Sequence, residues 1–390
     1  MIGVIADDLT GAAELGAAAL CQGWSAEVVT EGRPSGTSDL VCIDTDSRAQ
    51  PPREAARRVT AAVKVLQKAG ATWVYKKVDS VLRGQVIPEL EAMMRQLGAT
   101  RALLAPANPS LGRTIRDGKY LVRGKPLHQT EFARDPQFPR TSSRVLELLT
   151  TPQLFSLCGC TLRDELPESG IIIAEASSPR AVQQWTARRA PGMVLAGGVD
   201  FFSALLAADS PGNPRSTLSL PLPRPPGAAE REFFVSGSST AVARAFAAAA
   251  RRDQTPVFSL PQELAWGAVL RPEATAAIVG RIVSAFESHA RVVLTVGLPP
   301  VRNEKVSRGL TGQLVQIAAA VLERVEVGQV YADGGATAAE LVWRMGWSRL
   351  KLLREQAPGV ATLAVAGKKN LWLTIKPGSY PWPVEWTASR

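Results

Sequence analysis

Short apolar runs recur along this chain, and each is followed by small or polar residues and then by a helical pattern. In the first half the runs lie at residues 2–6, 40–44, 72–76, 101–105, 171–175 and 193–196. Repeated alternation of strand, turn and helix predicts parallel sheets whose faces are covered by helices. We therefore expect an α/β protein.

A proline-rich stretch divides the 390-residue chain. Residues 209–230 read DSPGNPRSTLSLPLPRPPGAAE, a composition that excludes regular structure. The strand–turn–helix order resumes in 232–252, 290–300 and 328–346. Because a chain of this length is too long for one ordinary core, we expect two domains, 1–210 and 230–390, joined by a linker at 211–229. Each domain should hold a mainly parallel sheet flanked by helices.

The scarcity of histidine and cysteine narrows the possible chemistry. The two histidines are His128 and His289, and the four cysteines are Cys21, Cys42, Cys158 and Cys160. The cysteine spacing fits no zinc site, and Cys-Gly-Cys is not the redox motif Cys-x-x-Cys. With so few histidines, the chain is poorly supplied with residues for a histidine-ligated metal site or a Ser-His-Asp triad. We expect no metal-binding side-chain cluster, and catalysis by carboxylates, Lys, Arg, hydroxyls and backbone amides.

The chain is basic, with a net charge of +10 and a pI of about 9.8. Basic proteins often bind polyanions, but here the charge is dispersed and no nucleic-acid reading motif is present. Small phosphorylated or carboxylated ligands also suit such a charge. The N-terminal MIGVIADD lacks the basic and apolar regions of a signal peptide, and no apolar run has the length of a membrane span. We expect a cytoplasmic protein without nucleic-acid or membrane partners.

Two adjacent aspartates, Asp7 and Asp8, stand where the first apolar run ends and a helical pattern begins. A carboxylate at a helix start is stabilised by free amides and the helix dipole, which accounts for one of them structurally. Ligands of open α/β sheets bind at the carboxyl ends of strands, where both aspartates stand. The pair could therefore hold substrate hydroxyls, and one member could accept a hydroxyl proton.

A second polar cluster follows the run at 72–76. Its polar residues are Lys76, Lys77, Asp79, Ser80 and Arg83. Arginine can bind a carboxylate through two hydrogen bonds and lysine supplies a point charge, so the segment is typical of a small anion site. The alternative is a surface loop in which Asp79 pairs with Lys77 or Arg83.

The stretch 106–136 is long, polar and rich in turn residues, and we expect it to be a loop. Long loops in compact domains are usually functional, and this one carries Arg113 among its polar residues. His128, in the same stretch, is expected to serve packing or hydrogen bonding rather than catalysis.

Two segments of the second half, VSGSST at 235–240 and DGGATA at 333–338, each follow an apolar run and precede a helical pattern. Small residues let backbone amides converge on an oxyanion, and the helix N-terminus adds positive potential. Neither matches a generic phosphate-binding motif, and singly each is typical of an ordinary tight turn. Together with KPGSY at 376–380, whose Lys376 and Gly378 could reach phosphates, they favour a nucleotide site.

Eight segments occur in the order found in one known family. They are IADDLTGAAELG, DTDSR, YKKVDSVLRG, PANPSLGRT, GKPLHQTEFARDP, VSGSST, DGGATA and KPGSY. On these segments, which span nearly the whole chain, the sequence resembles the four-carbon acid sugar kinases. The resemblance implies an N-terminal acid-sugar domain, a C-terminal nucleotide domain and an active site in the cleft between them. It also implies phosphoryl transfer from ATP to the terminal hydroxyl of threonate, erythronate or an oxo-tetronate.

The resemblance assigns roles to single residues. The acid-sugar pocket would be lined by Asp7, Asp8, Lys77, Asp79, Ser80, Arg83 and Arg113, and ATP would be held by Ser236, Ser238, Gly334, Gly335, Thr337 and Gly378. Arg83 and Lys77 would anchor the substrate carboxylate. Asp7 or Asp8 would orient the hydroxyl and accept its proton, which with Arg83 completes the expected catalytic set. Mg²⁺ would bridge the phosphates, held partly by nucleotide and water, as is usual for this ion.

The chain departs from the family pattern at three places. Val81 stands where a threonine is common, Glu175 stands where an aspartate is usual, and residues 378–381 are Gly-Ser-Tyr-Pro in place of an ending Gly-Phe-Gly. These changes concern the phosphate contacts and the choice of substrate. A non-catalytic sensor of a sugar acid or nucleotide is the alternative function. The sequence does not determine the oligomeric state, and a homodimer is considered because two-fold dimers are common.

Overall fold

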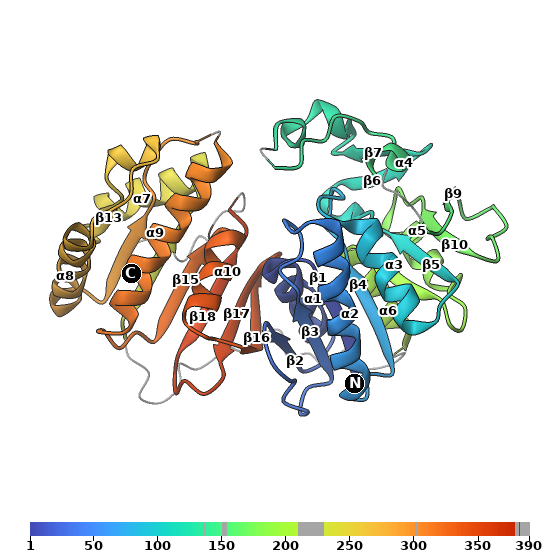
Figure 1. Ribbon diagram of the computed structural model, residues 1–390, viewed down its shortest axis with the longest axis horizontal. Helices are drawn as coiled ribbons and strands as arrows, with labels where there is room; N and C mark the ends of the chain where they lie inside the picture. The colour runs from blue at the N-terminus through green and yellow to red at the C-terminus, as the bar shows by residue number, and fades with distance from the viewer. Residues whose placement is uncertain (136, 150–153, 210–229, 302, 379–381, 383–390) are drawn as a thin grey trace. The chain divides into compact units, whose positions relative to one another are not determined.

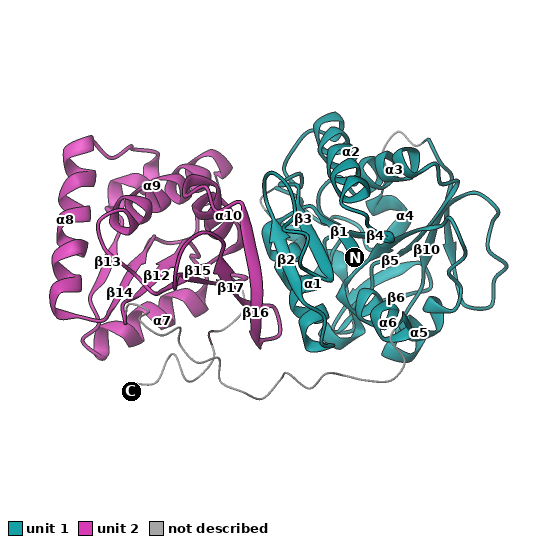
Figure 2. Ribbon diagram, turned by 90° about the horizontal axis from the view of Figure 1, so that it is seen from below, with its two compact units in different colours: residues 1–217 teal, residues 218–390 magenta. Residues whose placement is uncertain are grey.

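The computed structural model describes residues 1–135, 137–149, 154–209, 230–301, 303–378 and 382 (Figure 1). The chain divides into two compact units, residues 1–217 and 218–390 (Figure 2). The expected linker at 211–229 lies outside the described residues, so the domain boundaries stay a prediction. Within the described ranges, no helix combines the length and the apolar character needed to cross a bilayer.

Unit 1 is built on a parallel sheet with the strand order β2-β3-β1-β4-β11-β5-β10-β9. Its strands are β1 (Ile2–Ala6), β2 (Ala26–Val29), β3 (Leu40–Asp44), β4 (Trp73–Lys77), β5 (Arg101–Ala105), β9 (Leu157–Cys160), β10 (Gly170–Ala174) and β11 (Val194–Gly197). Each apolar run predicted in the first half is a strand of this sheet. The strands β2 and β9 are additional and were not predicted.

Helices cover both faces of this sheet, as the alternating pattern predicts (Figure 2). They are α1 (Leu9–Cys21), α2 (Pro52–Lys68), α3 (Val86–Leu97), α5 (Pro179–Thr186) and α6 (Val199–Asp209), with a single turn at α4 (Val145–Leu148). α2 packs beside α3 on one face, whereas α6 contacts α1 and α5 on the other. The apolar stripe of α2 is buried against the sheet, as its helical spacing predicts.

The prediction of one long loop at 106–136 was wrong in part. The segment contains a small antiparallel sheet of β6 (Arg113–Arg116), β7 (Lys119–Val122) and β8 (Lys125–Pro126), with 3₁₀ turns η1 (Pro109–Leu111), η2 (Leu127–Gln129) and η3 (Glu131–Arg134). The turn between β6 and β7 is Asp117-Gly118, with both φ angles positive at 50° and 69°. Asp-Gly is a strong signal for such a two-residue hairpin, and the sequence did contain it.

Unit 2 has the same design with a different edge. β13 (Val257–Ser259), β14 (Arg291–Thr295), β12 (Glu232–Ser236), β15 (Gln329–Asp333) and β18 (Trp372–Lys376) are parallel in that order, followed by antiparallel β17 (Val360–Val365) and β16 (Arg349–Ala357). The helices are α7 (Ala241–Arg252), α8 (Pro272–Ser288), α9 (Glu304–Leu322) and α10 (Gly335–Arg344), with a 3₁₀ turn η4 (Gln262–Trp266). α9 contacts α8 and α10 on one face, and α7 lies on the other (Figure 2). The α/β class with helix-flanked, mainly parallel sheets is confirmed.

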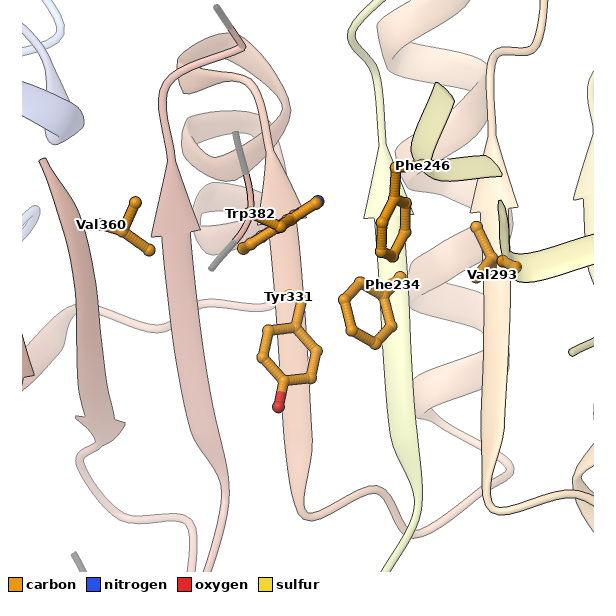
Figure 3. Packing of buried hydrophobic residues seen from close by; sticks show 7 residues of the cluster. Phe234, Phe246, Val293, Tyr331, Val360 and Trp382 are labelled. Atoms are coloured by element: carbon orange, nitrogen blue, oxygen red, sulfur yellow. The ribbon is translucent and has the colours of Figure 1, made fainter. Parts of the chain in front are cut away.

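Aromatic side chains fill the core of unit 2 between the sheet and α7 (Figure 3). Phe234 of β12 stacks on Tyr331 of β15, with ring centroids 4.1 Å apart and planes 14° from parallel. Phe246 of α7 and Trp382 pack on the same phenylalanine. The contact between Phe234 and Tyr331 joins neighbouring strands directly below the turns that follow them.

Replacement of Phe234 by alanine should lower the free energy of unfolding of unit 2 by about 3–5 kcal/mol, because it leaves a cavity in a close-packed core. Urea denaturation followed by far-UV circular dichroism measures the change. Trp343→Ala is the control, since this side chain of α10 is 72% exposed, and it should change stability by less than ~0.5 kcal/mol. Equal effects of the two substitutions would contradict the assignment of this core.

Candidate functional site

Arg48 connects the two aspartates at the end of β1 to the loop that follows β3. Its Nε lies 2.7 Å from Asp7 Oδ2 and its Nη2 lies 2.9 Å from Asp7 Oδ1, while Nη1 lies 2.7 Å from Asp8 Oδ2. β1 and β3 are adjacent and parallel, so their carboxyl ends meet at one edge of the sheet. Arg48 lies in the DTDSR segment, and the sequence alone indicated no role for it.

Asp8 is the N-cap of α1, so the structural interpretation of one aspartate is confirmed. Its carboxylate accepts hydrogen bonds from Gly11 N at 2.8 Å and from Thr10 Oγ1 at 2.6 Å. Burial alone would raise the pKa of Asp8, but the positive charge of Arg48, the Thr10 hydrogen bond and the charge of Lys77 outweigh it and hold the pKa below its usual value. Asp8 is therefore an oriented, ionised carboxylate.

The second predicted cluster joins the first through Arg48. Asp79 accepts from Arg83 Nη2 at 2.7 Å and from Arg83 Nε at 3.0 Å, and Arg48 Nη2 lies 3.7 Å from its Oδ1. Arg83 Nη1 also donates to Asp135 Oδ2 at 3.0 Å. Although burial opposes it, the charges of Arg83 and Arg48 hold the pKa of Asp79 well below the usual range. The pairing of Asp79 with Arg83, one of the alternatives from the sequence, is confirmed.

The side chains of the two lysines of β4 lie in different surroundings. Lys77 Nζ lies 3.1 Å from Glu14 Oε2, and despite burial the carboxylates of Glu14, Asp8 and Asp7 raise the pKa of Lys77. Lys76 is fully buried, 2.8 Å from Glu89 Oε2. The prediction that both lysines form one anion site was wrong for Lys76, since successive residues of a strand point to opposite faces.

The remaining predicted residues of unit 1 have other partners. The Ser80 carbonyl accepts a hydrogen bond from the Tyr120 hydroxyl. Arg113 of β6 lies over the Phe132 ring, 5.8 Å from its centroid. His128 Nδ1 lies 2.7 Å from Ser143 Oγ, which confirms the hydrogen-bonding role predicted for it.

Arg140 is a cation of this region that the sequence analysis did not name. Its Nη1 donates to Leu82 O at 2.9 Å and its Nε donates to Phe138 O at 3.0 Å. Burial and the charge of Arg83 lower the pKa of Arg140, although Asp79 opposes them. Within the described residues, no carboxylate forms an ion pair with this guanidinium.

In unit 2 a buried ion pair lies beneath the predicted nucleotide turns. Lys376 at the end of β18 is fully buried, with Nζ 2.6 Å from Asp333 Oδ1 at the end of β15. Ser236 Oγ at the end of β12 donates to Asp333 Oδ2 at 3.0 Å. Burial raises the pKa of Asp333 and lowers that of Lys376, and the partner charge opposes both shifts. Three adjacent strands thus end at one shared network.

The three small-residue turns above this network meet one another. The Gly378 carbonyl accepts from Thr240 Oγ1 at 3.0 Å and from Ser238 Oγ at 3.3 Å. A methyl group on Gly237 would overlap Thr337 Oγ1, and Gly334 has φ 108°, a conformation that favours glycine. The structure therefore brings together all six residues predicted to hold the nucleotide, namely Ser236, Ser238, Gly334, Gly335, Thr337 and Gly378. Ser379 and Tyr380 of the divergent KPGSY segment lie outside the described residues.

Asp44 at the end of β3 is a further acidic residue that the sequence analysis did not single out. Its Oδ1 accepts from Asp46 N at 2.8 Å. Burial, assisted by the negative charges of Asp8 and Asp46, raises the pKa of Asp44 to about 8. Like Asp7 and Asp8, it stands where an apolar run of the sequence ends, and that pattern could have identified it. Among the residues that the structure describes, no group of three or more His, Cys, Asp or Glu side chains forms a metal site.

We expect Asp44→Asn to stabilise the protein at pH 8 but not at pH 4. The folded-state pKa of about 8 lies above the ordinary aspartate pKa of 3.8, so folded Asp44 retains a proton that the unfolded chain releases. Its contribution to stability is therefore lost as pH rises from about 4 to about 8, and removing the ionisable group should recover ~1–3 kcal/mol at pH 8.

Urea denaturation across this pH range measures the effect. Asp117→Asn, in the turn between β6 and β7 and with a side chain 86% exposed, is the control. A pH-independent difference between Asp44→Asn and the parent protein would show that Asp44 is ionised in the folded state.

Comparison with known proteins identifies both units. A family model described as a sugar-binding N-terminal domain matches residues 2–164, and one described as a nucleotide-binding C-terminal domain matches residues 233–380. Two solved structures share the fold over nearly their whole length at 20% identity. A Haemophilus influenzae protein has a TM-score of 0.74 and covers 99% of both chains, and a Salmonella typhimurium protein has a TM-score of 0.78 and covers 97% of this chain and 96% of its own.

The relatives of known activity are sugar-acid kinases. The D-threonate kinase of Salmonella typhimurium is 42% identical over 149 residues, which are 37% of this chain and 35% of that enzyme, and the alignment with the Bordetella bronchiseptica D-threonate kinase spans 42% of that enzyme. The D-erythronate kinase of Heliobacterium modesticaldum is 26% identical over 91% of this chain and 88% of its own. The 3-oxo-tetronate kinase of Actinobacillus succinogenes is 24% identical over 97% and 96%. Because the two domain models follow the order of the sequence motifs and together span most of the chain, the chain belongs to the four-carbon acid sugar kinase family.

Proposed function

We propose that this protein transfers the γ-phosphoryl group of ATP to the terminal hydroxyl of a four-carbon sugar acid, with threonate, erythronate and 2- or 3-oxo-tetronate as the candidate substrates. The observation that carries the proposal is the meeting of three small-residue turns at the ends of β12, β15 and β18. The sugar-acid specificities of the relatives support the choice of acceptor. The expected location of catalysis between the domains and the homodimer both stay predictions.

The turns of unit 2 fit a polyphosphate. Their glycines have no side chains that would separate the backbone from a ligand. The adjacent starts of α7 and α10 add amide donors and positive potential. Ser238 and Thr240 hold the Gly378 turn in place through their hydroxyls, which a phosphate would have to share. Mg²⁺ bound to ATP would neutralise charge on the phosphates, with nucleotide and water as most of its ligands.

The cations of unit 1 fit an acid. Arg83 and Lys77, the predicted carboxylate anchors, are each already paired with a carboxylate of the protein, so a bound acid would have to share them. Arg140 adds a guanidinium bound to carbonyl oxygens, so its charge is available to an anion. A sugar acid that enters this region would bring its carboxylate to these three cations and its hydroxyls toward Asp7 and Asp8.

Asp7 and Asp8 would orient the reacting hydroxyl. Both are fixed by Arg48, and Asp8 is also fixed by its helix-capping hydrogen bonds. Phosphoryl transfer depends mainly on positioning and charge neutralisation, so a carboxylate of low pKa is suitable to receive the proton late in the reaction. The substrate oxygen bonds to the γ-phosphorus as the bond from that phosphorus to the β–γ bridging oxygen breaks. ADP leaves, the phosphoryl group stays on the substrate oxygen and the hydroxyl proton stays on the carboxylate.

A panel of tetronates incubated with the protein, ATP and Mg²⁺ tests the proposal. Coupled detection of ADP should show turnover only when the matching sugar acid is present. Binding of ATP or of an acid without any ADP formation would instead support the alternative, a non-catalytic sensor.

Asp8→Asn should reduce turnover by ~10²-fold or more if Asp8 is the proton acceptor, because asparagine cannot take the proton. Nucleotide affinity should stay nearly unchanged, and since asparagine is also a good N-cap, α1 should remain folded. Steady-state kinetics and calorimetry with ATP measure the two quantities. Undiminished turnover would exclude Asp8 from this role.

Gly237→Ala should weaken ATP binding by ~10-fold or more, since the added methyl overlaps Thr337 Oγ1 and displaces the turn. Gly280→Ala in α8 is the matched control, because a methyl group there meets no atom within 4 Å. Calorimetric titration with ATP compares the two variants. The same affinity in both would place ATP elsewhere.

A further inference from the structure

Two cysteines of the edge strand β9 lie side by side. Cys158 Sγ is 3.4 Å from Cys160 Sγ, and both thiols are free. Cys158 is exposed and Cys160 is buried. The Cys-Gly-Cys motif has no part in the proposed phosphoryl transfer, so its geometry needs a separate account.

The strand permits a bond between these two side chains. Residues two apart on a strand project to the same face and have Cα atoms roughly 6.6 Å apart, inside the limit of ~7 Å for a disulfide. Gly159 lies between them, and a methyl group placed on it would meet no atom within 4 Å. The backbone must bend at this position to bring the two sulfurs together, and the residue there is a glycine with open space around it.

The two thiols differ in reactivity in the order that such a reaction needs. Cys158 is accessible to a reagent in solution. Burial and the neighbouring Cys158 raise the pKa of Cys160 to about 12. Once Cys158 is held in a mixed disulfide, it no longer raises the pKa of Cys160, which can then ionise more easily and attack.

We propose that Cys158 and Cys160 are a reversible oxidation site that forms an intramolecular disulfide with a small-molecule disulfide as oxidant. Cys158 attacks one sulfur of the oxidant, which forms a mixed disulfide and releases one thiolate. Cys160 then attacks the Cys158 sulfur, which closes the protein disulfide and releases a second thiolate. The two protein thiols lose two electrons and two protons, and both are recovered in two reduced small thiols.

Formation of the disulfide changes the edge strand β9 of the unit 1 sheet. Glu175 N donates to Cys160 O at 2.9 Å, and the Glu175 carboxylate accepts from Asp117 N and Gly118 N at 2.9 Å and 2.7 Å. Bringing the sulfurs together bends β9 away from β10 at Cys160. We expect the amides of the Asp117-Gly118 turn to exchange with solvent faster in the oxidised protein.

The test incubates the full-length reduced protein with oxidised and reduced glutathione at a series of ratios. Mass spectrometry of the peptide that contains both residues should show loss of two hydrogens without retained glutathione, reversed by dithiothreitol. Cys160→Ser should stop at glutathione bound to Cys158, and Cys158→Ser should form neither product. Cys42, fully buried, should stay reduced in every sample.

Two results would overturn the proposal. One is a parent protein that keeps both thiols reduced under conditions in which Cys160→Ser takes up glutathione. The other is a parent protein that retains glutathione on Cys158 as Cys160→Ser does. If the disulfide forms but exchange at residues 117–118 is unchanged, the link through Glu175 is wrong.

Discussion

The guanidinium of Arg48 holds together three carboxylates that the parallel sheet of unit 1 forces into proximity. β1, β3 and β4 are neighbours and end at one edge, so Asp7, Asp8 and Asp79 are gathered there by topology. Like charges this close repel one another unless a cation lies among them. Arg48 contacts all three, and a methyl group on Gly84 would lie 3.1 Å from its Cγ. The glycine of the second motif therefore gives this arginine its space.

In unit 2, a single buried ion pair compensates the charge of the carboxylate at the strand ends. Asp333 and Lys376 come from adjacent strands, and their hydrogen bonds reach the ends of β12 and β15. A buried ion pair contributes little net stability, but breaking it leaves an uncompensated charge, so it fixes which arrangement of the turns is allowed. The glycines above it let the turns approach one another closely, since a methyl group on Gly237 would overlap Thr337 Oγ1 and one on Gly378 would lie 3.0 Å from Ser238 Oγ. Close approach of the turns brings their backbone amides together, as a polyphosphate site requires.

Sequence reasoning predicted the parts of the molecule that follow from periodicity and order. The apolar runs of the first half are all strands, and the segments expected to hold the nucleotide meet at one edge. It missed Arg48, Arg140 and Asp333, because a side chain's partner depends on which strands are adjacent, and strand order is not visible in the sequence. Lys76 shows the opposite error. A lysine is suitable for an anion site, but successive side chains of β4 point to opposite faces of the sheet, and Lys76 pairs with Glu89 in the interior.

The central claim is that the turns of unit 2 bind the triphosphate while the charged cluster of unit 1 binds the acid. Hydrogen exchange measured separately with ATP and with the accepted tetronate tests this division most directly. The account predicts that ATP slows exchange at residues 237–240 and 334–337, and that the acid slows exchange at residues 77–83. Slowing of the unit 1 segment by ATP alone, with no change in the unit 2 turns, would contradict it.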